Sequence, residues 1–500
     1  MNMLYKSTRD SLKEVTAAQA IAQGISDEGG LFVPAFLPTL TDDDFDRLAS
    51  YDYNGRAVDI LRRFLTDFTD SEIEDCVSAA YGANKFDTEN PANMQTLYDN
   101  VNILELWHGP TCAFKDMALQ LLPHLLTKSA QKVSPGKTTA ILVATSGDTG
   151  KAALEGFKDV DGTKVVVFYP GEGVSMLQKM QMVTQEGANV RVFAINGNFD
   201  DAQTGVKKIF TDEKIKNTLA ADNIQLSSAN SINWGRLVPQ IVYYVSAYCD
   251  LLASGKISKG DKFNVVVPTG NFGNILAAYY AMRMGVPIAK LICASNKNKV
   301  LTDFINSGTY DKRRDFYVTA SPSMDILISS NLERLLYGLE DNDDGIIKSY
   351  MSALQRDGVY NVSDKCLKRM QSLFYAGYMD DEGTFGVIKE CFEKYNYLCD
   401  THTAVAIGVY EKYAAETGDA TTTVIASTAS PYKFPTSVLK ALGKKADGDE
   451  FDRLYELNNV SGVKIPQSLA ALKSKPVRFN ETCTSENMAQ KIVDYLLNRE

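Results

Sequence analysis

The sequence predicts an α/β protein built on parallel β-sheets. Short apolar runs alternate with helical patterns in two blocks, at about residues 137–225 and 262–300. Runs such as 165–169 and 265–267 are apolar without alternation, which is typical of strands buried on both faces between two layers of helices. We therefore expect two parallel-sheet units of three layers each.

The chain has 500 residues, too many for one ordinary core, so two or three domains are expected. Residues 1–95 show helical patterns and acidic runs and form a separate N-terminal region. We expect a smaller α/β domain over residues 96–225 and a larger one over residues 226–500. The helical, charged stretch near residues 325–420 predicts an insertion in the larger domain.

Composition and charge narrow the range of possible functions. The net charge of −10 and a pI near 5.1 argue against a general nucleic-acid binder, which would carry a basic field. The eight cysteines and three histidines have no metal-like spacing, so neither a metal site nor a disulfide framework is expected. No run approaches the roughly 18 to 20 apolar residues of a membrane span, and no signal peptide is evident. We expect a soluble, cytoplasmic protein.

Lys115 is the first candidate for chemistry. It ends a loop rich in Gly, Pro and Thr that begins at His108, and an apolar helical pattern follows it. Most lysines are solvated surface charges. A lysine in a semi-enclosed turn, however, can lose its proton by desolvation and attack a carbonyl to form a Schiff base.

Three further loops follow predicted strands, where open parallel sheets collect ligands. Residues 145–150 could bind an anion at a helix start, or simply cap that helix. Residues 268–274 have two glycines three apart and could direct N–H groups at a phosphate, although a plain tight turn explains them as well. Residues 426–431 could offer a hydroxyl to a ring nitrogen, or form a Ser/Thr-rich turn. Together with Lys115, these loops suggest pyridoxal 5'-phosphate.

Five runs resemble the threonine synthase family, in its longer bacterial and fungal type. This family belongs to the tryptophan synthase β-like class (fold type II) of pyridoxal phosphate enzymes. The runs are His108–Asp116, Ala144–Lys151, Asn230–Arg236, Pro268–Asn274 and Ser427–Phe434. The N-terminal runs 18–24 and 30–34 match as well, and the resemblance extends in collinear order from about residue 4 to 445. It identifies residues 1–95 as the N-terminal domain of this family.

The resemblance implies a role for each matched residue. Lys115 would be the catalytic residue and would carry the cofactor as a Schiff base, and Thr428 would face the pyridine nitrogen. The cofactor phosphate would be held by Gly270, Asn271, Phe272, Gly273 and Asn274. The substrate carboxylate would be held by Thr145, Ser146, Gly147, Asp148 and Thr149. The substrate phosphate would be held by Asn230, Ser231, Asn233 and Arg236, with Lys151 as a further candidate.

The implied reaction converts O-phospho-L-homoserine and water to L-threonine and phosphate. Phosphate leaves from Cγ and water adds at Cβ, while the freed amine of Lys115 moves protons at Cα and Cβ. A monomer or homodimer is expected. The alternatives are a threonine-synthase-like phospho-lyase that yields a 2-oxo acid, a hydroxy-amino-acid dehydratase, and a non-catalytic nucleotide-binding protein.

Three positions depart from the common strings of the family. Cys112 stands where an aliphatic residue is frequent, Asn274 where an acidic residue is frequent, and Ser430 where some members carry histidine. None of these changes removes a role named above, but Ser430 bears on how substrate or water is handled.

Overall fold

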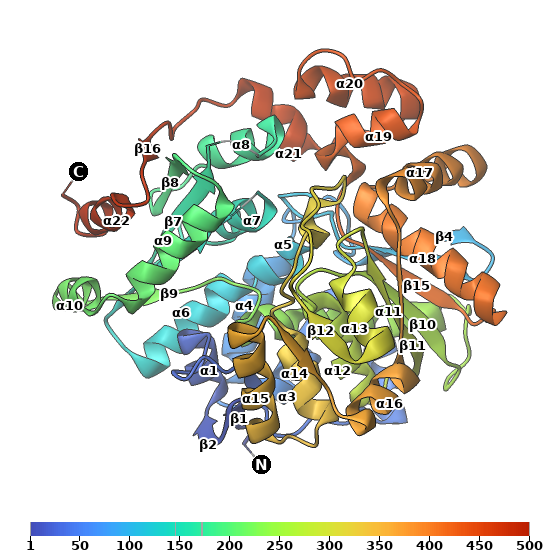
Figure 1. Cartoon of the computed structure of the whole chain (residues 1–500), viewed down its shortest axis with the longest axis horizontal. Helices are drawn as coiled ribbons and strands as arrows, with labels where there is room; N and C mark the ends of the chain where they lie inside the picture. The colour runs from blue at the N-terminus through green and yellow to red at the C-terminus, as the bar shows by residue number, and fades with distance from the viewer. Residues whose placement is uncertain (1, 146, 172–173, 500) are drawn as a thin grey trace.

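The computed structural model describes residues 2–145, 147–171 and 174–499. Two sheets that consist mainly of parallel strands organise the chain, and helices lie on both sides of each (Figure 1). This arrangement confirms the predicted α/β class with parallel sheets. Within the described residues, no helix combines the length and the apolar character that crossing a bilayer requires.

The larger sheet has six strands in the order β14-β11-β10-β15-β5-β4. Their bounds are β14 Phe374–Tyr378, β11 Ile288–Ser295, β10 Phe263–Pro268, β15 Thr423–Ser427, β5 Val101–Glu105 and β4 Asn93–Tyr98. All neighbours pair in parallel except β4, which is antiparallel to β5. Successive residues of β10 face opposite sides: Val265 joins the core around α11 and α12, and Val266 joins the core around α18. Burial on both faces explains the unbroken apolar run.

The smaller sheet has five strands, all parallel, in the order β16-β8-β7-β6-β9. Their bounds are β16 Thr482–Cys483, β8 Val190–Ile195, β7 Thr163–Pro170, β6 Thr138–Ala144 and β9 Ile224–Ser227. Val165 of β7 packs on the side of α6 to α8, whereas Val166 packs on the side of α9, α10 and α22. This sheet is therefore also the middle of three layers.

The remaining helices and strands connect or cover these sheets (Figure 1). The N-terminal elements are β1 Tyr5–Ser7, β2 Asp10–Val15, α1 Ala17–Gln23, β3 Phe32–Pro34, α2 Asp42–Ala49, α3 Tyr53–Phe64 and α4 Asp70–Tyr81. The middle helices are α5 Lys115–Leu119, α6 Leu122–Val133, α7 Asp148–Gly156, α8 Met176–Val183, α9 Phe199–Thr211, α10 Glu213–Ala221, α11 Trp234–Ala253, α12 Gly273–Arg283 and α13 Val300–Ser307. The later elements are β12 Thr309–Asp311, η1 Pro322–Met324, α14 Leu332–Leu339, α15 Asp344–Arg356, β13 Val359–Asn361, α16 Asp364–Leu373, α17 Asp381–Tyr395, α18 Thr401–Thr417, η2 Pro431–Lys433, α19 Pro435–Ala441, α20 Glu450–Ser461, α21 Gln467–Ala470, η3 Ala471–Ser474 and α22 Met488–Leu496.

The sheets draw on segments from across the boundaries expected from the sequence. Strand β5 lies in the range expected for the smaller domain but pairs with β15 of the larger sheet, and β16 near the C-terminus pairs with β8 of the smaller sheet. The expected insertion at 325–420 is helical over much of its length but also contains β14, an edge strand of the larger sheet. The division into domains at residues 95 and 225 stays a prediction.

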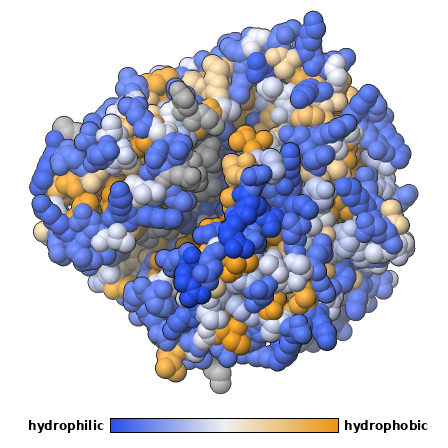
Figure 2. Space-filling model, in the orientation of Figure 1, coloured by the Kyte–Doolittle hydropathy of each residue, from blue (hydrophilic) through white to orange (hydrophobic). Residues whose placement is uncertain are grey.

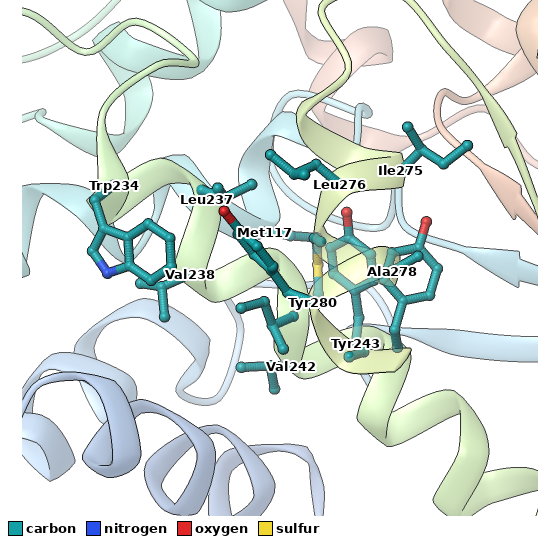
Figure 3. Packing of buried hydrophobic residues seen from close by; sticks show 14 of the residues in the cluster. Met117, Trp234, Leu237, Val238, Val242, Tyr243, Ile275, Leu276, Ala278 and Tyr280 are labelled. Carbon is teal, nitrogen blue, oxygen red and sulfur yellow. The ribbon is translucent and has the colours of Figure 1, made fainter. Parts of the chain in front are cut away.

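The short helix α5 is anchored in the largest core. Met117 lies among side chains of α11 and α12 such as Leu237 and Leu276 (Figure 3), and its backbone carbonyl accepts a hydrogen bond from Tyr81 at 2.5 Å. On another side, α7 approaches α5 so closely that a Cβ added at Gly156 would stand 1.9 Å from the backbone oxygen of Leu119. Only glycine permits this contact.

We predict that Gly156→Ala lowers the melting temperature, because the backbone of α5 cannot yield as a flexible side chain would. Overpacking of this kind costs about 1–3 kcal/mol. The matched control is Gly386→Ala in α17, where an added Cβ meets nothing within 4 Å. Removing a mid-helix glycine there should stabilise the protein by roughly 0.5–1 kcal/mol. Equal melting temperatures for the two variants would contradict the close approach of α7 to α5.

Candidate active site

Backbone pairing brings the Lys115 loop beside the loop after β15. Ala113 and Ala429 form an antiparallel bridge, flanked by hydrogen bonds from Phe114 N–H to the Thr428 carbonyl at 2.9 Å and from Ser430 N–H to the Cys112 carbonyl at 3.0 Å. Two segments more than 300 residues apart in sequence are thereby fixed side by side. The two predicted cofactor contacts, Lys115 and Thr428, are consequently neighbours.

The amine of Lys115 is largely shielded from solvent, with 12% of the side chain exposed. Its Nζ lies 3.4 Å from Asp148 Oδ2 and 3.3 Å from Ser323 Oγ. Burial lowers the pKa of Lys115; the Asp148 carboxylate opposes this shift, and the charges of Lys433 and Arg236 add to it. The surroundings therefore favour the neutral, nucleophilic amine more than water does.

The glycine loop at the start of α12 presents unused backbone donors. Within the described part of the chain, the N–H groups of Gly270 to Asn274 donate to no acceptor. The buried Nδ2 of Asn274 also has no hydrogen-bond partner there. A Cβ added at Gly270 would stand 2.6 Å from the backbone oxygen of Ser323, so this loop lies against the segment that contacts Lys115. Converging N–H groups at a helix N-terminus bind phosphate.

The loop after β6 is shaped by Thr145. Its Oγ1 accepts hydrogen bonds from the N–H groups of Gly147 and Gly150, each at 3.0 Å. The N–H groups of Asp148 and Thr149 donate to no acceptor in the described residues, so they are available to an anion. The side chain of Asp148 itself is bound to two lysines. Ser146, a predicted member of this set, lies outside the described residues.

Arg236 on α11 carries a buried positive charge without a carboxylate partner among the described residues. The residue is 4% exposed; its Nη1 donates to the Ala229 carbonyl at 2.8 Å, and its Nε has no partner. Burial lowers the pKa of Arg236 to about 10. A buried charge is costly unless it is paired. This guanidinium thus fits an anionic ligand.

The other candidates for the substrate phosphate differ from Arg236 in their surroundings. Asn233 caps α11 by accepting from Gly235 N–H at 2.8 Å and donates from Nδ2 to the Ile21 carbonyl at 2.9 Å, so its amide is already used within the chain. Ser231 Oγ accepts from Asn331 at 3.4 Å, and Asn230 is exposed. Lys151 is paired with Glu155 at 2.9 Å. The roles predicted for these residues stay predictions.

Two residues of the site, Ser323 and Lys433, were not assigned a role from the sequence. Ser323 lies in a segment with no strand end or motif to mark it, and it is fixed by a hydrogen bond from its N–H to His402 Nε2 at 3.1 Å. Lys433 was quoted within the run Ser427–Phe434 but received no role; its Nζ lies 2.7 Å from Asp148 Oδ1. A lysine in an otherwise apolar turn was the available signal.

These donor sets fit pyridoxal phosphate: a shielded amine, a cradle of free N–H groups, and the hydroxyl-bearing Thr428 nearby. Figure 2 shows the surface hollowed between the side that carries α9 and the side that carries α13, and α5 lies between these sides in Figure 1. The described residues contain no cluster of His, Cys, Asp or Glu arranged for a metal ion.

Comparison with known proteins identifies the family of the chain. Family models match residues 4–81 (threonine synthase N terminus), 95–428 (pyridoxal-phosphate dependent enzyme) and 403–493 (threonine synthase, C-terminal). Since the second spans more than half of the chain, fold and site define a pyridoxal-phosphate-dependent enzyme. The threonine synthases of Saccharomyces cerevisiae and Pseudomonas aeruginosa are 35% and 37% identical, over 88% of this chain and 89% and 90% of theirs. The chain belongs to the threonine synthase family of lyases.

Solved structures support the same assignment. The chain is similar to PLP-bound threonine synthase from Brucella melitensis, with a TM-score of 0.88, 34% identity and 99% of both chains covered. It is also similar to human threonine synthase-like 1, with 40% identity over 89% of this chain. The chain spans about three fifths of the length of the threonine synthase-like 1 proteins.

We predict that the purified protein has an absorbance band at about 410–420 nm, where the Schiff base of the bound cofactor absorbs. Lys115→Ala should lose this band, because no other amine stands in the same place. Lys262→Ala, an exposed lysine, is the control and should keep it. The measurement is an absorbance spectrum after dialysis against the cofactor; a band that persists in Lys115→Ala would refute the assignment.

Proposed function

We propose that this protein is a threonine synthase that converts O-phospho-L-homoserine and water to L-threonine and phosphate. The observation that carries the proposal is the buried guanidinium of Arg236, which has no carboxylate partner in the described part of the chain and is close enough to Lys115 to help lower its pKa. The free N–H groups of Gly270 to Asn274 suit the phosphate of the cofactor, so Arg236 is left for a second anion. A phosphate on the substrate is the simplest candidate.

Separate sets of donors suit the carboxylate and the phosphate of this substrate. The free N–H groups of Asp148 and Thr149 suit a carboxylate, and Arg236, with Ser231 and Asn230 on the preceding loop, suits a phosphate. An amino acid without a phosphate would leave the guanidinium uncompensated. This favours phosphohomoserine over the free hydroxy-amino acids that a dehydratase would use.

Lys115 is the proton carrier in the proposed reaction. When bound, the cofactor supplies an electron sink that makes the protons of the substrate acidic. Once displaced by the substrate amine, Nζ of Lys115 takes a proton from Cα and moves protons at Cβ. Asp148 remains an anion 3.4 Å away and stabilises the ammonium that forms.

A phospho-lyase that releases phosphate and yields 2-oxobutyrate is the second candidate. The identity to human threonine synthase-like 1, 40%, is somewhat higher than that to the yeast and Pseudomonas threonine synthases. Ser430, placed beside Cys112 by a backbone hydrogen bond, also departs from the histidine of some members. The cytoplasmic location and the monomeric or dimeric state also remain proposals.

We predict that phosphohomoserine yields phosphate and threonine in equal amounts. Purified holoenzyme is incubated with the substrate, and phosphate, threonine and 2-oxobutyrate are quantified together. Phosphate accompanied by 2-oxobutyrate alone would replace the synthase with the phospho-lyase. Turnover of free serine or threonine without any turnover of phosphohomoserine would favour the dehydratase.

We predict that Arg236→Gln lowers kcat/KM for phosphohomoserine about 10- to 100-fold, mostly through KM, because hydrogen bonds to charged groups contribute about 1.5–3 kcal/mol. The absorbance band of the cofactor should stay, since Arg236 does not belong to its cradle. Arg356→Gln, on an exposed part of α15, is the matched control. A normal KM in a folded Arg236→Gln variant would contradict the proposed phosphate site.

A further inference from the structure

Lys433 is a buried lysine next to the active site that the proposed reaction does not use. It ends the short turn η2, and 1% of its side chain is exposed. Its ammonium reaches three acceptors: Asp148 Oδ1 at 2.7 Å, the Thr111 carbonyl at 3.1 Å and Gln181 Oε1 at 3.2 Å. An ammonium has three N–H donors, so Lys433 is fully satisfied as a cation.

Asp148 stands between Lys433 and Lys115. Its Oδ1 faces Lys433 at 2.7 Å and also accepts from Gln178 at 3.1 Å, whereas its Oδ2 faces Lys115 at 3.4 Å. Burial alone would raise the pKa of Asp148, but the charges of Lys433 and Lys115 hold it well below its usual value. One buried carboxylate is thus shared by two buried amines.

One carboxylate cannot compensate two ammonium groups in a shielded site. The two lysines do not compete equally for it, because Lys433 is closer and has three acceptors, whereas Lys115 has two contacts of 3.3 and 3.4 Å. The contacts that stabilise an ammonium group are therefore weaker at Lys115.

We propose that Lys433 is a positioning residue: it neutralises Asp148 and thereby leaves the amine of Lys115 free to lose its proton. This inference rests on the proposed role of Lys115 as the cofactor-bearing proton carrier. Without Lys433, Asp148 would form an isolated ion pair with Lys115 and keep it protonated.

Other charged groups face these residues and define the controls. Arg236 on α11 lies on the side of Lys115 and lowers its pKa in every variant alike. Asp116 on α5, held by Thr111, and the Cys112 thiol face Lys433. Burial raises the pKa of Asp116 to about 7, so Asp116 changes charge within the range of the experiment. A second variant that removes the charge of Asp148 separates the effect of Asp148 on the ionisation of Lys115 from the effect of Asp116.

The test is the pH dependence of cofactor capture by the full-length protein stripped of cofactor. Pyridoxal 5'-phosphate is added between about pH 6 and pH 10, around the range in which a perturbed lysine titrates, and the rise of the Schiff-base band is followed. The midpoint of the rate reports the ionisation of Lys115. Lys433→Met should raise this midpoint by about one pH unit or more, which slows capture about tenfold at neutral pH.

Two further variants distinguish charge from shape. Lys433→Arg keeps the charge and should keep the midpoint close to that of the unaltered protein. The double variant Lys433→Met/Asp148→Asn removes both charges and should bring the midpoint back down. A folded Lys433→Met protein with an unchanged midpoint would overturn the proposal.

If Lys433→Met fails to fold, the variant Asp148→Asn provides a second test of the proposal. Asp148→Asn retains Lys433 and removes the only carboxylate in contact with Lys115 among the described residues, so its midpoint should fall. A midpoint that does not fall would overturn the proposal as well. A protein that shows these shifts but forms no threonine would sink the proposed reaction and leave the role of Lys433 standing.

Discussion

The active site depends on the short backbone pairing between the Lys115 loop and the loop after β15. Two hydrogen bonds, one on each side of the bridge between Ala113 and Ala429, fix the start of α5 against the carboxyl end of a central strand. Met117 anchors α5 in the largest core, and the lack of a side chain at Gly156 allows α7 to pack closely against α5. The position of one amine is therefore determined by backbone contacts and by packing, and little freedom is left to its side chain.

Around this amine, the balance of buried charge decides what it can do. Asp148 is the carboxylate within reach of Lys115, and Lys433 engages it at a shorter distance. Arg236 adds a buried cation nearby that has no carboxylate partner among the described residues. The positive charges of Lys433 and Arg236 suit anionic ligands and lower the pKa of Lys115. Substrate binding and proton transfer in this account thus have one electrostatic origin.

Local patterns in the sequence predicted those strands and loops that depend on residues close together in the chain. The unbroken apolar runs of β6, β7 and β10 identified buried parallel strands, and the three loops do follow β6, β10 and β15. Sheet membership was not predictable, because β5, β14 and β16 reach their partners across long distances in the chain. Ser323 and Lys433 were not predicted for the same reason: each becomes part of the site only through its contact with Lys115 or Asp148 in the folded protein.

The most direct test of the central claim locates the cofactor on the chain. The holoenzyme is reduced with borohydride, digested and sequenced by mass spectrometry, which identifies the lysine that carries the reduced cofactor. The account predicts the label on Lys115 alone, although Lys151 and Lys433 are also buried lysines. A label on either of those two lysines, with Lys115 unmodified, would contradict it.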